Sequence, residues 1–170
     1  ADQRRVCGGK LNCLAGVPPA GVSIATADAT LISNLQFAAA QAGKSGIELL
    51  LEPLNTVDNP GFLISTSARA LAIMDAVGSE NLRLQYDVYH AQVMEGNLVK
   101  TLQTKLSRIG HIQIADNPGR HEPGTGEINF PFLFSVLDQI AYRGWIGCEY
   151  IPRTSSGESL SWLKAWLKPA

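Results

Sequence analysis

Short apolar segments alternate along this chain with amphipathic segments of about a dozen residues. The apolar segments are typical of strands and the amphipathic ones of helices. Strands are expected at residues 10–15, 46–52, 82–87, 111–115 and 145–150. Helices are expected at residues 28–42, 66–77, 97–109, 130–142 and 159–167, with Ser65 or Thr66 as the N-cap of the second, Asn129 as the N-cap of the fourth, and Gly43, Gly78 and Gly110 as stops. This alternation predicts an α/β fold with a parallel sheet and right-handed crossovers.

The two faces of each predicted strand differ in character. Within residues 82–87, one face carries Arg83, Gln85 and Asp87, and the other carries Leu82, Leu84 and Tyr86. A doubly wound sheet, covered by helices on both faces, would need both faces to be apolar. A barrel needs one apolar face, since the other lines an interior whose top is the active site. The pattern favours the (β/α)8 TIM-barrel class, of which this 170-residue chain would supply about five units as a single partial domain, residues 1–170.

Four of the predicted strands carry an acid or amide toward their carboxyl ends: Glu52, Asp87, Gln113 and Glu149. Glu52 precedes Pro53, which ends its strand because proline has no N–H for the ladder. In a barrel these side chains would converge, and carboxylates that meet repel one another unless they are protonated or bridged by a cation. Four oxygen ligands, with no thiolate or imidazole, suit Mg²⁺ or Mn²⁺ rather than zinc. The alternative is that such acids cap helices or pair with arginines.

Four sequence runs carry a family resemblance. They are Tyr-Asp-Val-Tyr-His-Ala-Gln at 86–92, His-Ile-Gln-Ile-Ala-Asp at 111–116, Gly-Arg-His-Glu-Pro-Gly-Thr-Gly-Glu-Ile-Asn at 119–129, and Gly-Trp-Ile-Gly-Cys-Glu-Tyr at 144–150. Together they resemble the hydroxypyruvate isomerase family, a branch of the xylose-isomerase-like TIM barrels, and the resemblance runs from Lys10 almost to the end of the chain. The Glu, Asp, Gln, Glu order of that family's metal ligands matches the four residues at the strand ends.

The resemblance implies a metal-dependent aldose–ketose isomerase that interconverts hydroxypyruvate and 2-hydroxy-3-oxopropanoate (tartronate semialdehyde). A proton leaves one carbon, an enediolate forms, and a proton returns to the neighbouring carbon. A divalent metal, Mg or Mn, would be the cofactor and would polarise the carbonyl. Glu52 and Glu149 would be the acid and base, in either assignment.

Three further residues are candidates for substrate binding. His90, three residues after Asp87, could form a hydrogen bond with a substrate oxygen as a neutral imidazole, or could instead support its loop. Arg120 could bind the substrate carboxylate through two parallel hydrogen bonds, or could be a surface arginine. Glu122, with His121, could belong to the same clamp or shape the loop. His111 begins its predicted strand, far from the active-site end, and is assigned a structural role.

Composition limits the class of partner. A net charge of −1 does not indicate the basic surface that nucleic-acid-binding proteins need. No apolar run approaches the length of a membrane span. The three cysteines, Cys7, Cys13 and Cys148, are expected to be buried thiols of a reducing compartment, so a cytoplasmic location is expected. The expected partner is a small 2-oxo or hydroxy acid. The near-neutral charge and only three histidines argue against the DNA-repair endonucleases that share this barrel.

The family has three βα units before those found here. The chain could therefore be part of a longer protein, could associate with another chain or as a homo-oligomer, or could persist as a half-barrel. Weak or absent isomerase activity is expected from the chain alone. Two other functions stay open. One is a related isomerase or epimerase acting on a 2-oxo-tetronate or a ketose, and the other is a non-catalytic fragment that binds a partner through its sheet edges.

Overall fold

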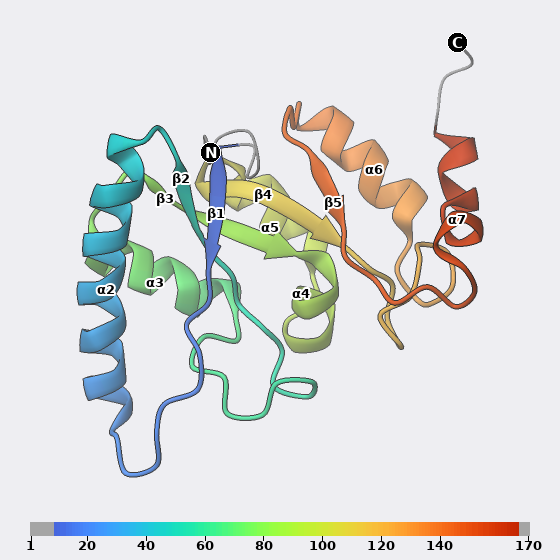
Figure 1. Ribbon diagram of the computed structural model, residues 1–170. Coiled ribbons are helices and arrows are strands. Elements are labelled where there is room, and N and C mark those ends of the chain that lie inside the picture. The colour runs from blue at the N-terminus through green and yellow to red at the C-terminus, as the bar shows by residue number, and fades with distance from the viewer. Residues whose placement is uncertain (1–8, 167–170) are drawn as a thin grey trace.

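A computed structural model describes residues 9–166 of the chain (Figure 1). Its centre is a five-stranded parallel sheet whose strands lie side by side in chain order. The strands are β1 (Lys10–Cys13), β2 (Glu48–Leu51), β3 (Leu82–Asp87), β4 (Ile109–Ile114) and β5 (Ile146–Cys148). A doubly wound sheet reverses its strand order at a switch point. The unbroken order seen here is instead that of consecutive barrel strands, which confirms the predicted class.

Helices connect the strands and lie outside the sheet (Figure 1). They are α2 (Ile24–Lys44), α3 (Ser67–Val77), α4 (Val88–Met94), α5 (Leu98–Lys105), α6 (Phe130–Gln139) and α7 (Ser156–Ser159), with short 3₁₀ helices at Leu106–Arg108 and Ser161–Ala165. Within residues 9–166, no helix combines the length and the apolar character needed to cross a membrane.

The two faces of the sheet divide as the alternation predicts. Leu49, Leu84 and Ile112 point toward the helices and belong to one buried apolar cluster with Leu35 of α2 and Leu133 of α6. The opposite face carries polar side chains into an open cavity. One apolar and one polar face per strand is the arrangement of a barrel wall, with the helices outside and the interior solvated or ligand-filled.

Two predicted helix starts are confirmed, and one is wrong. The Thr66 hydroxyl accepts from the backbone N–H of Arg69, and the Asn129 side chain accepts from Phe132. The helix expected at residues 28–42 begins four residues earlier, at Ile24, because Ser23 provides the N-cap. Asp28, in the first turns of this helix, instead pairs with Arg69 of α3.

Three segments differ from the sequence prediction. The helix expected at 97–109 ends at Lys105 and tightens into a 3₁₀ turn, so β4 begins at Ile109 and contains Gly110. The helix α4 was not predicted, because its seven residues are too few for a clear periodicity. The helix expected at 159–167 is replaced by α7 and a 3₁₀ turn, and its last residue lies outside the described part.

Gly110 is not a helix stop but a point of close approach inside the sheet. A methyl group there would lie 2.6 Å from Leu50 Cδ2 and 2.7 Å from Arg83 Cβ. We expect Gly110→Ala to lower the free energy of unfolding by about 1–3 kcal/mol, as overpacking does in cores. Urea denaturation would measure the change. Gly157→Ala in α7, where nothing lies within 4 Å, is the control and should not destabilise the protein. Equal effects of the two changes would contradict the close-packing argument.

The cysteine prediction is partly wrong. Cys13 is partly buried, but Cys148 is exposed, because β5 lies at the edge of the described sheet and no neighbouring strand covers it. Cys7 lies outside the described residues.

Candidate active site

The polar face of the sheet lines a cavity of about 520 Å³, to which every strand contributes. The contributing side chains come from the strands or the positions just after them: Asn12, Glu52, Gln85, Gln113 and Glu149. The carboxyl ends of parallel strands lie at one edge of a sheet, which is why residues about 40 positions apart in sequence meet here.

Glu52 and Asp87 form the buried centre of this site. Their exposed fractions are 3% and 2%. Glu52 Oε2 accepts a hydrogen bond from Asn12 Nδ2 at 2.6 Å, and Asp87 Oδ1 accepts from the backbone N–H of Tyr89 at 2.8 Å. The other two oxygens, Glu52 Oε1 and Asp87 Oδ2, are buried and have no hydrogen-bond partner among residues 9–166. Buried acceptors without partners are uncommon and point to a missing ligand.

Both carboxyl groups of this pair have pKa values raised above their usual range. Burial, together with the charge of Asp87, raises the pKa of Glu52 to about 7. Burial is also the main cause that raises the pKa of Asp87 to about 6, against the lowering effect of its hydrogen bond from Tyr89 and of Arg120. Glu52 can therefore exchange a proton near neutral pH, as a general acid or base must.

His90, on α4, lies beside the two carboxylates. Glu52, Asp87 and His90 each offer a ligand atom within 4.8 Å of the others, and all three residues are buried. His90 Nε2 lies 3.8 Å from Asp87 Oδ2 and has no hydrogen-bond partner in the described part of the chain. Its Nδ1 faces Asn55, whose backbone N–H donates to it at 3.1 Å. Burial lowers the pKa of His90 to about 4, so the ring is neutral at physiological pH.

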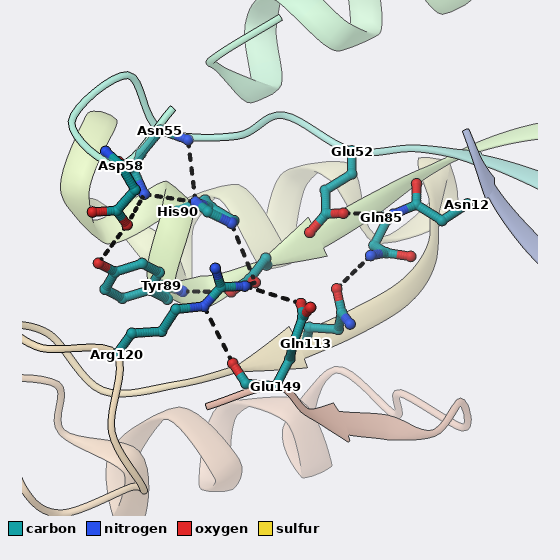
Figure 2. A network of polar contacts seen from close by, with 11 residues as sticks. Asn12, Glu52, Asn55, Asp58, Gln85, Tyr89, His90, Gln113, Arg120 and Glu149 are labelled. Atoms are coloured by element: carbon teal, nitrogen blue, oxygen red, sulfur yellow. Dashed lines mark hydrogen bonds and ion pairs between the residues drawn. The ribbon is translucent and has the colours of Figure 1, made fainter. Parts of the chain in front are cut away.

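Arg120 closes the other side of the cavity (Figure 2). Its Nη2 lies 3.0 Å from Glu149 Oε2 and 3.7 Å from Asp87 Oδ2. Its guanidinium also lies over the ring of Tyr89, 5.4 Å from the centroid. Gln113, on β4, accepts a hydrogen bond from Gln85 through Oε1. The structure thus brings together six of the seven predicted site residues: Glu52, Asp87, His90, Gln113, Arg120 and Glu149.

Glu122 lies apart from them. Its carboxylate accepts from the backbone N–H of Arg153 at 3.1 Å, and it borders a separate hollow beside Gly157. Glu122 is two residues beyond Arg120, and the loop turns between them because Arg120 adopts a left-handed conformation with φ 54°. His111, which was expected to begin its strand far from the site, lies within β4, and its side chain lines the cavity.

Sequence reasoning missed a set of supporting residues around the site: Asn12, Asn55, Asp58 and Tyr89. Asn12 could have been found, since it shares a strand face with the cavity residues. No sequence signal links Asn55 to His90, because their contact spans 35 positions between a loop and a short helix.

The loop that presents Arg120 is organised by Asp116. This carboxylate is fully buried and accepts four backbone hydrogen bonds, from Asn117, Gly124, Gly126 and Ile128 at 2.8–3.1 Å. The Asp116 N–H also donates to His121 O at 2.8 Å, which closes the loop. One side chain therefore satisfies the backbone of a segment that has no regular secondary structure.

Asp116→Asn is expected to loosen this loop. The new amide group would present a donor where two backbone N–H groups need an acceptor, so the free energy of unfolding should fall by about 3 kcal/mol. Urea denaturation would measure the loss, and hydrogen exchange at Gly124 and Gly126 would locate it. Asp138→Asn, at an exposed position on α6, is the matched control, with a change expected within about 0.5 kcal/mol. Unchanged protection at both glycines would contradict the assigned role of Asp116.

Comparison with known proteins places this site in a family. Residues 4–166 match the family model described as xylose isomerase-like TIM barrel. The chain is 50% identical over 154 residues to hydroxypyruvate isomerase of Escherichia coli (strain K12), covering 91% of this chain and 60% of that protein. It is 45% identical over 158 residues to 2-oxo-tetronate isomerase of Cupriavidus necator, covering 93% and 61%.

Among solved structures, the chain resembles one titled AP endonuclease, family 2, from Brucella melitensis. The TM-score is 0.89 at 38% sequence identity, and the match covers 94% of this chain and 62% of that one. This chain thus spans about three fifths of the length of the curated relatives it matches. The consecutive parallel strands, the polar inner face and these matches agree: the chain belongs to the xylose isomerase-like TIM barrel family.

Proposed function

We propose that this chain carries the active site of a divalent-metal-dependent isomerase that interconverts hydroxypyruvate and 2-hydroxy-3-oxopropanoate. The observation that carries the proposal is the buried pair of Glu52 and Asp87, whose inward oxygens have no partner within the described residues. The relatives named hydroxypyruvate isomerase and 2-oxo-tetronate isomerase support the reaction class. This chain covers 60% of the length of the relative named hydroxypyruvate isomerase. The activity of a complete barrel is therefore proposed for this chain and not established by the comparison.

The donor set fits a hard divalent cation. Glu52, Asp87, Gln113 and Glu149 offer carboxylate and amide oxygens, the ligands that Mg²⁺ and Mn²⁺ prefer. A cation there would neutralise carboxylates that otherwise raise one another's pKa, and when bound it would supply a Lewis acid for the substrate carbonyl.

Two glutamates are proposed to move the proton. Glu52 Oε1 faces the cavity while Glu52 Oε2 is held by Asn12, so one oxygen can take a proton from a substrate carbon without loss of the hydrogen bond. Glu149 approaches from the strand end on the other side of the cavity and returns a proton to the neighbouring carbon. The two follow β2 and β5, strands that β3 and β4 separate, so they can approach a planar intermediate from different directions.

Arg120 and His90 are proposed to orient the substrate. The Arg120 guanidinium can form two parallel hydrogen bonds with a substrate carboxylate, and its stacking on Tyr89 limits its movement. His90 Nε2 is buried beside the reacting region and would contact a substrate hydroxyl or carbonyl oxygen. Glu122 is left out of this role, because its carboxylate is turned toward Arg153.

The test is an isomerisation assay with hydroxypyruvate and with 2-oxo-tetronate, in the presence of Mg²⁺, Mn²⁺ or a chelator. We expect conversion that the chelator abolishes and that either cation restores, with hydroxypyruvate preferred. Turnover should be slow for the chain alone, since β1 and β5 are the outer strands of the sheet within residues 9–166 and the described strands do not close into a barrel around the cavity. Activity that survives complete metal removal would overturn the proposed chemistry. Preference for 2-oxo-tetronate would assign the chain to the second function, which the 45% identical relative supports.

A further inference from the structure

We propose that Asn55 fixes the tautomer of His90, so that the ring presents an Nε2–H donor to the cavity and cannot act as a metal ligand. The catalytic consequence rests on the proposed isomerase function, but the tautomer itself does not. Asn55 is fully buried in the loop after β2, and His90 is 2% exposed on α4 (Figure 2).

The backbone of Asn55 determines which ring nitrogen carries the proton. Its N–H donates to His90 Nδ1 at 3.1 Å. A backbone N–H can only donate, so Nδ1 must accept and carries no hydrogen. In a neutral imidazole the single N–H is then on Nε2.

The side chain of Asn55 enforces the same assignment. Its Oδ1 accepts from two backbone N–H groups, those of Val57 at 3.1 Å and Asp58 at 2.8 Å. The amide orientation is therefore determined by unambiguous donors, and Nδ2 must face the other way. There it lies 2.7 Å from His90 Nδ1 and 2.9 Å from Asp58 Oδ2, so Nδ1 meets two donors from one residue.

Asp58 and Tyr89 hold Asn55 in this position. The Tyr89 hydroxyl donates to Asp58 Oδ2 at 2.7 Å, the same oxygen that accepts from Asn55 Nδ2. Every polar atom of the Asn55 side chain is thus used, and the loop at residues 55–58 is joined to α4. In this network His90 Nε2 is left free, 3.8 Å from Asp87 Oδ2, beyond hydrogen-bond distance.

The position of His90 would allow it to be either a metal ligand or a hydrogen-bond donor to the substrate, and the Nε2–H tautomer decides between these two roles. His90 lies close enough to Glu52 and Asp87 to be grouped with them as a ligand. A protonated Nε2 has no lone pair to coordinate a cation, whereas it can donate to a substrate oxygen. The cation is then left to oxygen ligands, and His90 acts on the substrate. Asn55 is a positioning residue, since it touches His90 and not the cavity.

The test is ¹⁵N NMR of the histidine side chains, recorded on the whole 170-residue chain without metal and with Mg²⁺. In the unmodified protein we expect an unprotonated Nδ1 and a protonated Nε2 for His90, with no change of tautomer on addition of Mg²⁺. An unprotonated Nε2, or its coordination when metal is added, would overturn the proposal. This measurement needs no catalysis, so it can succeed even where the isomerase assay fails.

Three variants then test the role of Asn55. Asn55→Asp keeps the backbone N–H that donates to His90 Nδ1 and the acceptor for Val57 and Asp58, but replaces the amide donor against Nδ1 by a carboxylate oxygen. A carboxylate at this shorter distance competes with the backbone donor and favours an N–H on Nδ1, so we expect Nδ1 to become protonated. Asp58→Asn keeps an acceptor for Asn55 and Tyr89 and is the matched control, with the tautomer retained. If Asn55→Asp does not fold, Asn55→Ser retains a loop-capping hydroxyl and removes the amide donor.

Activity gives the second readout. With Asn55→Ser we expect kcat to fall by about 10–100-fold, as for other residues that orient a catalytic group, with a smaller change in KM. If Nδ1 stays unprotonated in Asn55→Asp, or Asn55→Ser keeps full kcat, the backbone N–H alone fixes the tautomer and the side chain of Asn55 has only a structural role.

Discussion

Glu52→Gln is expected to lower the isomerase kcat by about a thousandfold or more. The glutamine has the same shape and keeps an oxygen for Asn12, but it cannot exchange the proton that Glu52 Oε1 is placed to transfer. Loss of a general acid or base typically costs 10²–10⁴-fold, and a weaker cation site adds to this. Steady-state kinetics with hydroxypyruvate at saturating Mn²⁺ would measure the effect.

Glu48→Gln is the matched control for this variant. Glu48 begins β2 and Glu52 directly follows the end of this strand, four residues later, so the alternation of side chains places both on the same face. Glu48 pairs with Lys10 at 2.9 Å. We expect its replacement to change kcat less than tenfold. If both variants lose the same activity, the loss comes from disruption of the sheet around β2 and not from removal of the proton-transfer group. If Glu52→Gln keeps normal kcat, the proton-transfer assignment is wrong.

The same Glu52→Gln variant should be more stable than the unmodified protein when no metal is bound. The folded-state pKa of Glu52 is raised to about 7, so its contribution to stability is present below its unfolded pKa of about 4.3 and is lost as pH rises through about 7. A glutamine has no such loss. The stability gap between variant and unmodified protein should open over this pH window and reach about 4 kcal/mol, at about 1.4 kcal/mol per pKa unit.

Chelator-treated protein, denatured with urea at pH 4.5, 6 and 7.5, would measure this gap. Mg²⁺ or Mn²⁺ should close or reverse it at pH 7.5, because the cation binds the carboxylate of the folded protein and stabilises that state. The Glu48→Gln variant removes an ion pair and should not gain stability. A gap that is constant with pH, or that narrows as pH rises, would show that Glu52 is not a carboxyl destabilised by burial.

Much of the fold is predictable because it depends on local rules. Thr66 and Asn129 begin their helices where the capping pattern predicts, since a cap needs only a side chain three residues before its donor. The limits of β3 follow from its alternation. The errors come where tertiary packing overrides local preference. The sequence predicts Gly110 as a helix stop, but this residue lies in β4. Glycine is needed there because Leu50 and Arg83 leave no room for a side chain.

In the candidate site, too, local sequence patterns predict some residues correctly and fail for others. Glu52, Asp87, Gln113 and Glu149 could be selected from the sequence, because parity along a parallel strand decides which face a side chain takes and strand ends meet at one edge. Glu122 could not be excluded in this way, since the left-handed turn at Arg120 directs it elsewhere.

The sequence by itself therefore determined the barrel class, the polar inner face and the acids at the strand ends, all of which follow from short-range periodicity. Only the tertiary structure decided which oxygens are buried without partners, how far the pKa of Glu52 is raised, and which nitrogen of His90 faces the cavity. These properties depend on the distance and solvent exposure of groups up to 40 residues apart, such as Asn12 and Glu52, and no local pattern encodes them.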